Sequence, residues 1–77
     1  MVEAIVLVQV KVGASSAVAE AIGEIAGVTE ASVVAGPYDV IVRVEADGLD
    51  ELAQVVVSNI QAVEGVSRTL TCPIISI

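Results

Sequence analysis

Few residues in this chain could carry out chemistry. Its 77 residues include ten acids and three basic residues, one cysteine, one tyrosine and no histidine. Without histidine, the most common general base and the imidazole metal ligand are both missing, and a single cysteine cannot supply the cysteine pairs of a zinc site. The glycines fall at turns and element ends and form no phosphate-binding loop. We therefore expect no enzyme activity, no metal and no cofactor.

The chemically distinctive residues are Tyr38 and Asp39, which stand side by side in "AGPYDVIVRV". Gly36 and Pro37 precede them, so a rigid turn holds the only aromatic ring and a carboxylate at the end of a sheet. The same residues suit an ordinary hairpin turn, and from composition and position alone that is the favoured interpretation. Cys72, in a strand-like stretch, is expected to be a small buried hydrophobe.

The elements that must position these residues follow a β-α-β-β-α-β order. Runs rich in β-branched residues, bounded by turn residues, predict four strands: Val2–Val12, Val28–Ala35, Tyr38–Ala46 and Val66–Ile77. The second and third strands should form a hairpin, and Pro73 suggests an edge strand or a bulge.

Two helices are expected between the strands. The first is capped by Ser15 or Ser16 and stops at Gly27, and the second is capped by Asp47 and stops at Gly65. Apolar residues at helical spacing mark their inner faces: Val18, Ile22 and Ile25 in the first, and Leu49, Leu52, Val56, Ile60 and Val63 in the second. The segments "AGVTEASVV" and "EGVSRTLTC" also repeat, one after each helix. These features predict an α+β, ferredoxin-like fold, a four-stranded antiparallel sheet with both helices on one face.

The two faces of the predicted sheet differ in character. One face is apolar and should lie under the helices: Ala4, Val6, Val8 and Val10 with Tyr38, Val40, Val42 and Val44. The opposite face mixes apolar and charged residues: Ile5, Leu7, Gln9 and Lys11 with Asp39, Ile41, Arg43 and Glu45. A solvated face would be more uniformly polar, so this mixture favours packing against another sheet.

Composition also points to self-association. The chain is long enough for one domain, and its hydrophobic content of 56% exceeds what so small a core can bury. A net charge of −7 disfavours direct nucleic-acid binding. No apolar run is long enough to span a membrane, and no secretory signal is visible. We expect a cytoplasmic homo-oligomer.

The motifs together resemble the effector-binding (RAM) domain of the Lrp/AsnC family of transcription regulators. The family pattern, a Gly-x-Tyr/Phe-Asp turn followed by Gly-Val-x-x-Thr-x-Thr, corresponds here to Gly36, Tyr38 and Asp39 and then to Gly65, Val66, Thr69 and Thr71. The resemblance covers nearly all of the chain. It implies dimers formed by sheet-to-sheet packing, assembled into rings of dimers that are commonly octamers, with an amino acid bound between dimers.

Carried over to this chain, the resemblance implies a ligand site made of Gly36, Tyr38, Asp39, Leu49, Thr69, Thr71 and Cys72. Asp39 would pair with the ligand ammonium, and backbone N–H groups or the threonine hydroxyls would take its carboxylate. On this basis Asp39→Ala should abolish ligand binding and change the melting temperature little. Relatives often carry larger residues at Cys72 and Pro73, which leaves the identity of the ligand open.

One departure concerns domain organisation. Family members usually carry an N-terminal helix-turn-helix that binds DNA, whereas this sequence begins at the first predicted strand. It resembles the stand-alone versions, and residues 1–77 are expected to form a single ligand-binding domain without a DNA-binding domain. The leading hypothesis is an amino-acid-binding regulatory module. The alternative is a ligand-free assembly domain that partners a full-length family regulator. A small dimeric enzyme of the monooxygenase type is disfavoured by the missing histidine and aromatic pocket.

Overall fold

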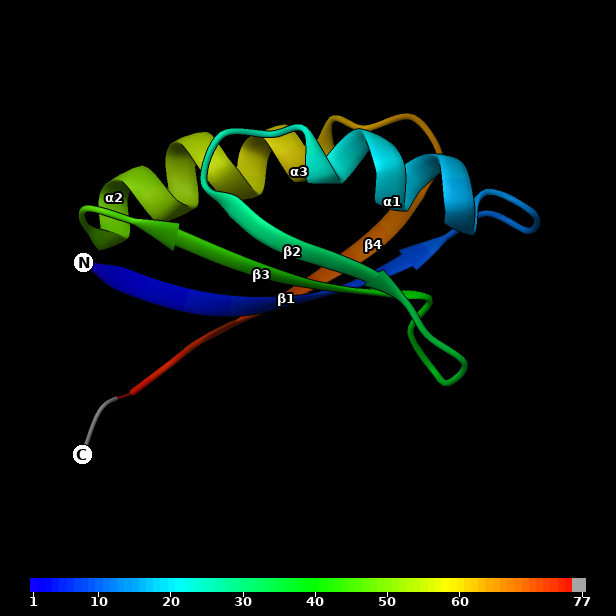
Figure 1. The fold of residues 1–77 in the computed structure, drawn as a ribbon, viewed down its shortest axis with the longest axis horizontal. Coiled ribbons are helices and arrows are strands. Elements are labelled where there is room, and N and C mark those ends of the chain that lie inside the picture. Colours follow the sequence, from blue (N-terminus) through cyan, green and yellow to red (C-terminus); the bar gives the residue numbers. More distant parts are fainter. Residues whose placement is uncertain (76–77) are drawn as a thin grey trace.

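Alternating aliphatic residues build a four-stranded antiparallel sheet with helices on one face (Figure 1). The computed structural model describes residues 1–75. Its elements are β1 (Val2–Val10), α1 (Ser15–Gly23), β2 (Val28–Val33), β3 (Val40–Ala46), α2 (Leu49–Glu51), the π-helical segment η1 (Leu52–Val57), α3 (Ser58–Gln61) and β4 (Val66–Pro73). The strand order is β2-β3-β1-β4. The predicted β-α-β-β-α-β fold is therefore confirmed, including the β2–β3 hairpin and the edge position of Pro73 on β4.

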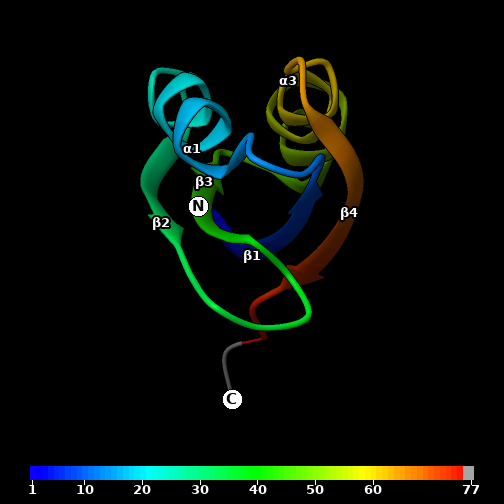
Figure 2. The same ribbon diagram turned by 90° about the vertical axis from the view of Figure 1, so that its right-hand side faces the viewer.

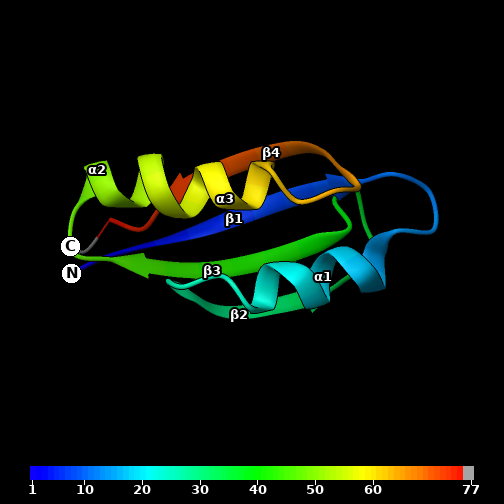
Figure 3. The ribbon, with the colours of Figure 1, turned by 90° about the horizontal axis from the view of Figure 1, so that it is seen from above.

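The core lies between the sheet and the helices and is wholly aliphatic. Each of the central strands β1 and β3 contributes three completely buried side chains: Ala4, Val6 and Val8, and Val40, Val42 and Val44. The helices bury Val18, Ile22, Leu52, Val56 and Ile60 against them. Seen from above, α1 lies over the β2–β3 side and α2–α3 over the β1–β4 side (Figure 3). The period-2 pattern identified this face correctly from Ala4 to Val8 and from Val40 to Val44, but not at Tyr38, which precedes β3.

The second helical stretch runs from α2 through η1 to α3 and changes its winding on the way. Leu52, Val56 and Ile60 are spaced by four residues, which overshoots one turn of an α-helix. The i→i+5 pattern of a π-helix widens the turn, so the same spacing falls short of a full turn there. Passing from π to α winding therefore keeps all three side chains over the sheet, where they are almost fully buried. Within residues 1–75 no helix is long and apolar enough to cross a membrane.

Several element ends differ from the sequence-based expectation. β1 stops at Val10 instead of Val12, although the Lys11 N–H still donates to the Gly65 carbonyl, just before β4, at 2.9 Å. Neither Ser15 nor Ser16 caps α1, since the cap position falls on Ala14 and makes no side-chain hydrogen bond.

The second helical stretch also starts differently from the prediction. Its cap position is Gly48, in extended backbone, and not Asp47. Instead, the Asp47 N–H, one residue before the cap, donates to Glu51 Oε2 at 3.2 Å, so the first helical turn is tied to the residue that precedes it.

The predicted repeat is visible as a reciprocal contact between the two halves. Gly27 precedes β2 with φ +95°, and a Cβ there would lie 2.8 Å from Val56 on the second helical stretch. Gly65 precedes β4 with φ +100°, and a Cβ there would lie 2.9 Å from Val18 on α1. Each glycine thus supplies a left-handed backbone conformation and lets its loop approach the helix of the other half.

Candidate functional site

The Gly36–Asp39 turn links β2 to β3 and hangs below the sheet, on the side away from the helices (Figures 1 and 2). β3 begins at Val40, so Tyr38 is not part of a strand as the sequence suggested. Tyr38 and Asp39 are both partly buried. The turn therefore carries Tyr38 and Asp39 on the side of the sheet that the helices leave open.

Asp39 ties this turn to the end of β1. The ladder between β1 and β3 ends at the pair Val8–Val40. Beyond it, the Asp39 N–H donates to the Val8 carbonyl at 2.9 Å, and the Val10 N–H donates to Asp39 Oδ2, also at 2.9 Å. The carboxylate thus replaces a backbone carbonyl that the ladder no longer supplies to Val10, a role that the sequence did not reveal.

Gln9 adds a second side-chain link to the turn. Its Nε2 donates to the Pro37 carbonyl at 2.9 Å. The contact joins residues 28 positions apart, so local sequence reasoning could not identify it. The available signal was a polar residue interrupting the apolar run "IVLVQVKV" of β1.

The predicted site residues of β4 face opposite sides of the sheet. Thr69 pairs with Val8 and Thr71 with Val6, so both lie on the helix-facing side and are partly buried. The Thr69 hydroxyl accepts a hydrogen bond from Gln61 Nε2 at 3.0 Å. Cys72 is exposed on the open face, contrary to the expectation of a buried thiol.

Leu49 lies far from the predicted site residues of the Gly36–Asp39 turn. It begins α2, at the end of the molecule opposite to the Gly36–Asp39 turn (Figure 1). Its side chain is 60% exposed, so its predicted place on the inner helix face is wrong. One protomer therefore brings together Gly36, Tyr38 and Asp39 in the turn, while Leu49 lies at the opposite end and the other predicted site residues lie along β4.

The open face of the sheet carries a continuous apolar row. Leu7 of β1 is paired with Ile41 of β3 on one side and Leu70 of β4 on the other. Ile41 is 37% exposed and Leu70 47%. Charges lie on both sides of this row: at one end Arg43 Nε stands 3.9 Å from Glu3 Oε1, and at the other Arg68 pairs with Gln9. The face combines an apolar centre with charged margins, as its sequence pattern indicated.

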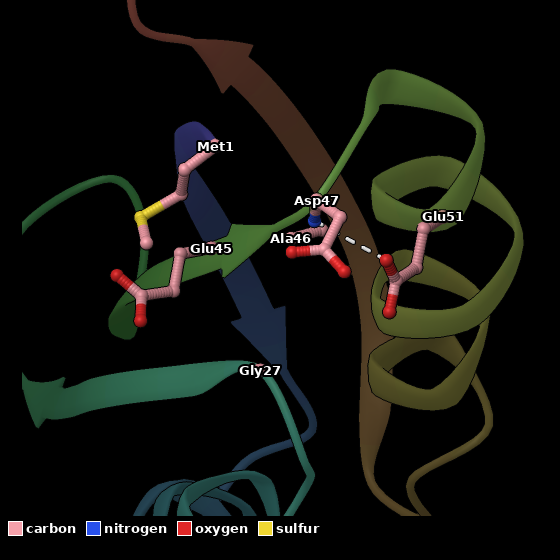
Figure 4. A pocket seen from close by; sticks show the side chains of 6 residues that line it. All are labelled: Met1, Gly27, Glu45, Ala46, Asp47 and Glu51. Atoms are coloured by element: carbon pink, nitrogen blue, oxygen red, sulfur yellow. Dashed lines mark hydrogen bonds between the residues drawn. The ribbon is translucent and has the colours of Figure 1, made fainter.

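Two surface hollows occupy equivalent places in the two halves, one at each of the close-approach glycines. The hollow at Gly27 has a volume of about 190 Å³, and in Figure 4 Glu45 and Glu51 stand on either side of it, with Met1 at its rim. The hollow at Gly65 has a volume of about 420 Å³ and is lined by Lys11, Ala14, Ala17 and Glu64. Neither hollow is lined by a residue of the predicted ligand site, and the first is too acidic to receive a carboxylate.

The element order, the strand order and the reciprocal halves define a ferredoxin-like α+β domain. Comparison with known proteins narrows the class. The family model described as "Lrp/AsnC ligand binding domain" matches residues 3–77. The chain belongs to this family of ligand-binding domains, whose members include transcription regulators.

A solved structure of similar size is the protein TTHA0845 from Thermus thermophilus. It is 36% identical, with a TM-score of 0.91, and the similarity covers 100% of this chain and 96% of that one. The shared fold therefore extends over the whole of this chain and nearly all of that protein.

Two curated relatives are longer proteins. A homocitrate synthase of Sulfurisphaera tokodaii is 46% identical over 57 residues, which are 74% of this chain and 12% of the synthase. An uncharacterized HTH-type transcriptional regulator of Pyrococcus furiosus is 37% identical over 54 residues, 70% of this chain and 36% of the regulator. The chain thus corresponds to a small part of each of these proteins.

Proposed function

We propose that this domain binds a free α-amino acid and acts as a regulatory module within a cytoplasmic homo-oligomer. The observation that carries the proposal is the Gly36–Asp39 turn of a ligand-binding-domain family, held in place with its acid beside the open face. The bound amino acid would change the assembly, or the interaction of the assembly with a partner.

The turn suits an ammonium group. Oδ2 of Asp39 accepts the Val10 N–H, which fixes the orientation of the carboxylate before a ligand arrives. The other oxygen makes no hydrogen bond within residues 1–75, and a preoriented carboxylate forms stronger charge-assisted bonds to an ammonium. Tyr38, partly buried beside it, would contact the ligand side chain or a neighbouring copy.

The rest of the site would come from other copies. In one protomer α2, which begins at Leu49, lies at the opposite end from the turn (Figure 1), and the β4 threonines lie on the helix-facing side of the sheet. A site assembled from several protomers accounts for this dispersal, and it would couple ligand binding to assembly because a ligand stabilises the state it prefers.

Dimers would form through the open face. The row Ile41–Leu7–Leu70 leaves apolar surface in water, and burying it against a second sheet is favourable by about 25 cal/mol per Å². The margin charges, including Arg43 and Glu3, would remain at the rim, where charged groups cost little.

The relatives favour a second use of the same module. One relative is a homocitrate synthase and another a regulator with a helix-turn-helix, so the domain occurs with partners of two classes. In this second function, the chain would act as an assembly domain that binds a separate enzyme or regulator. It would need no small ligand to do so.

A melting-temperature screen with the L-amino acids distinguishes these functions. A ligand present at 100 times its Kd stabilises the folded state by about 2.7 kcal/mol, which in a domain of this size is a shift of roughly 10–20 °C. The D-enantiomer of any active amino acid is the matched control, and sedimentation with and without ligand reports assembly. If no amino acid raises the melting temperature, the ligand-free assembly function replaces the proposal.

A further inference from the structure

The Gly36–Asp39 turn is held strongly at its base and sparsely at its tip. At the base, Asp39 makes backbone hydrogen bonds to Val8 and Val34 and a side-chain bond to Val10, each of 2.9 Å. At the tip, residues 36–38 make one hydrogen bond within the described part of the chain, from Gln9 Nε2 to the Pro37 carbonyl. Pro37 has no N–H of its own to donate.

We infer that Gln9 is a positioning residue, whose amide sets the conformation of the Gly36–Asp39 turn and thereby tunes the affinity of the site. This inference rests on the proposed function for its ligand part, because it names what regulates that same site. Gln9 reaches the turn from β1 with an N–H donor, and the only aromatic ring of the chain follows directly after the carbonyl that it holds.

The position of Gln9 also places it between the turn and the apolar row of the open face. On β1 it comes two residues after Leu7, the centre of that row, and it pairs with Arg68 of β4. Packing of a second sheet on the row would exclude water from this end of the face, and a hydrogen bond out of water is harder to replace. Dimer formation would therefore stabilise the conformation of the turn that the Gln9 bond to Pro37 holds.

Removing the donor should loosen the turn without unfolding the sheet. Gln9 is partly buried, and Gln9→Glu keeps its length and shape but sets a carboxylate against the Pro37 carbonyl. Gln9→Lys keeps an N–H donor and should hold the turn. Gln54→Glu, at an exposed position on η1, adds the same charge elsewhere and is the matched control.

The test uses Tyr38, whose fluorescence has no aromatic background in this chain. We expect Gln9→Glu to increase quenching of Tyr38 by acrylamide and to speed amide exchange at Asp39 by about 2- to 12-fold, the effect of losing one hydrogen bond. Gln9→Lys and Gln54→Glu should stay close to the native protein. Unchanged quenching and exchange in Gln9→Glu would overturn the inference, as would equal loosening in Gln9→Lys, because the donor would then be irrelevant.

A second arm separates this inference from the proposed function. The L-amino acid that stabilises the native protein most should bind Gln9→Glu more weakly and Gln54→Glu with native affinity. If no amino acid stabilises the native protein, the proposed function fails while the Tyr38 measurements still decide the role of Gln9. If the native protein binds and Gln9→Glu binds equally well, the role of Gln9 in the site is refuted.

Discussion

Replacement of Asp39 should reveal two separable roles of one carboxylate. Asp39 Oδ2 accepts the partly buried Val10 N–H at 2.9 Å. Asp39→Ala removes the acceptor and leaves that N–H without a partner, a loss of about 1–2 kcal/mol for a group that retains some access to water. In a domain of this size the melting temperature should fall by about 4–16 °C. The sequence alone suggested that Asp39→Ala would change the melting temperature little. Because of this hydrogen bond, we now expect a measurable decrease.

Asp39→Asn is the control that separates stability from charge. Its amide oxygen can still accept the Val10 N–H, so we expect a stability loss less than half of that in Asp39→Ala. Its neutral side chain cannot pair with an ammonium as a carboxylate does, so amino-acid binding should be lost in both variants.

Urea unfolding followed by circular dichroism gives the measurement, because it does not depend on Tyr38. The slope m should be unchanged, since neither substitution alters the surface exposed on unfolding. Equal stability of the native protein and Asp39→Ala would refute the stabilising role of the bond, and native affinity for an amino acid in Asp39→Asn would refute the ammonium assignment.

Three further outcomes are expected. Gly65→Ala should destabilise the folded domain by more than the roughly 1–2 kcal/mol cost of left-handed backbone, because its Cβ would overlap Val18 and crowd Ala14. Gly13→Ala is the control, since its Cβ would lie in open space at φ +80° and should cost only the backbone part. Equal losses of stability in urea unfolding would contradict the close packing at Gly65. Ile41→Glu should convert dimers to monomers in sedimentation at micromolar concentration, since it buries an unpaired charge, and a native monomer would contradict the open-face interface. The chain alone, with its net charge of −7, should not shift duplex DNA in a gel. Tight, salt-sensitive binding would show that the net charge does not prevent DNA binding.

The periodicity of apolar residues in the sequence predicted which side chains of the strands and helices are buried. The alternation of β1 and β3 identified the completely buried residues, because each strand of the central pair has one face toward the helices. Four-residue spacing identified Leu52, Val56 and Ile60 as buried, yet it could not distinguish α from π winding, because that spacing lies between the two periods. Composition likewise could not decide where the exposed thiol of Cys72 points, since that depends on the register of β4 with β1.

Of the candidate site, the sequence predicted only the turn, whose residues are neighbours in the chain. The Gly36-x-Tyr38-Asp39 motif located the turn, but the bonds that orient it come from Val10 and Gln9 on a strand distant in sequence. Leu49 was placed by spacing on the inner face, although the helix begins at this residue and its side chain is largely exposed. Contacts between distant segments and the ends of elements depend on tertiary packing, which a single sequence does not state.

The strand order has a consequence for how the protein is made. Of the four strands of this sheet, β1 leaves the ribosome first, and it is also a central strand, with β3 and β4 as its two neighbours. Its edge toward β4 stays unpaired until the last strand has been synthesised, and during that interval it offers free backbone groups and aliphatic side chains to other chains. The β2–β3 hairpin can form early because its closure is local, whereas the Val8–Thr69 pairing must wait for most of the chain. Completion of the sheet by β4 is therefore the step at which aggregation and productive folding compete.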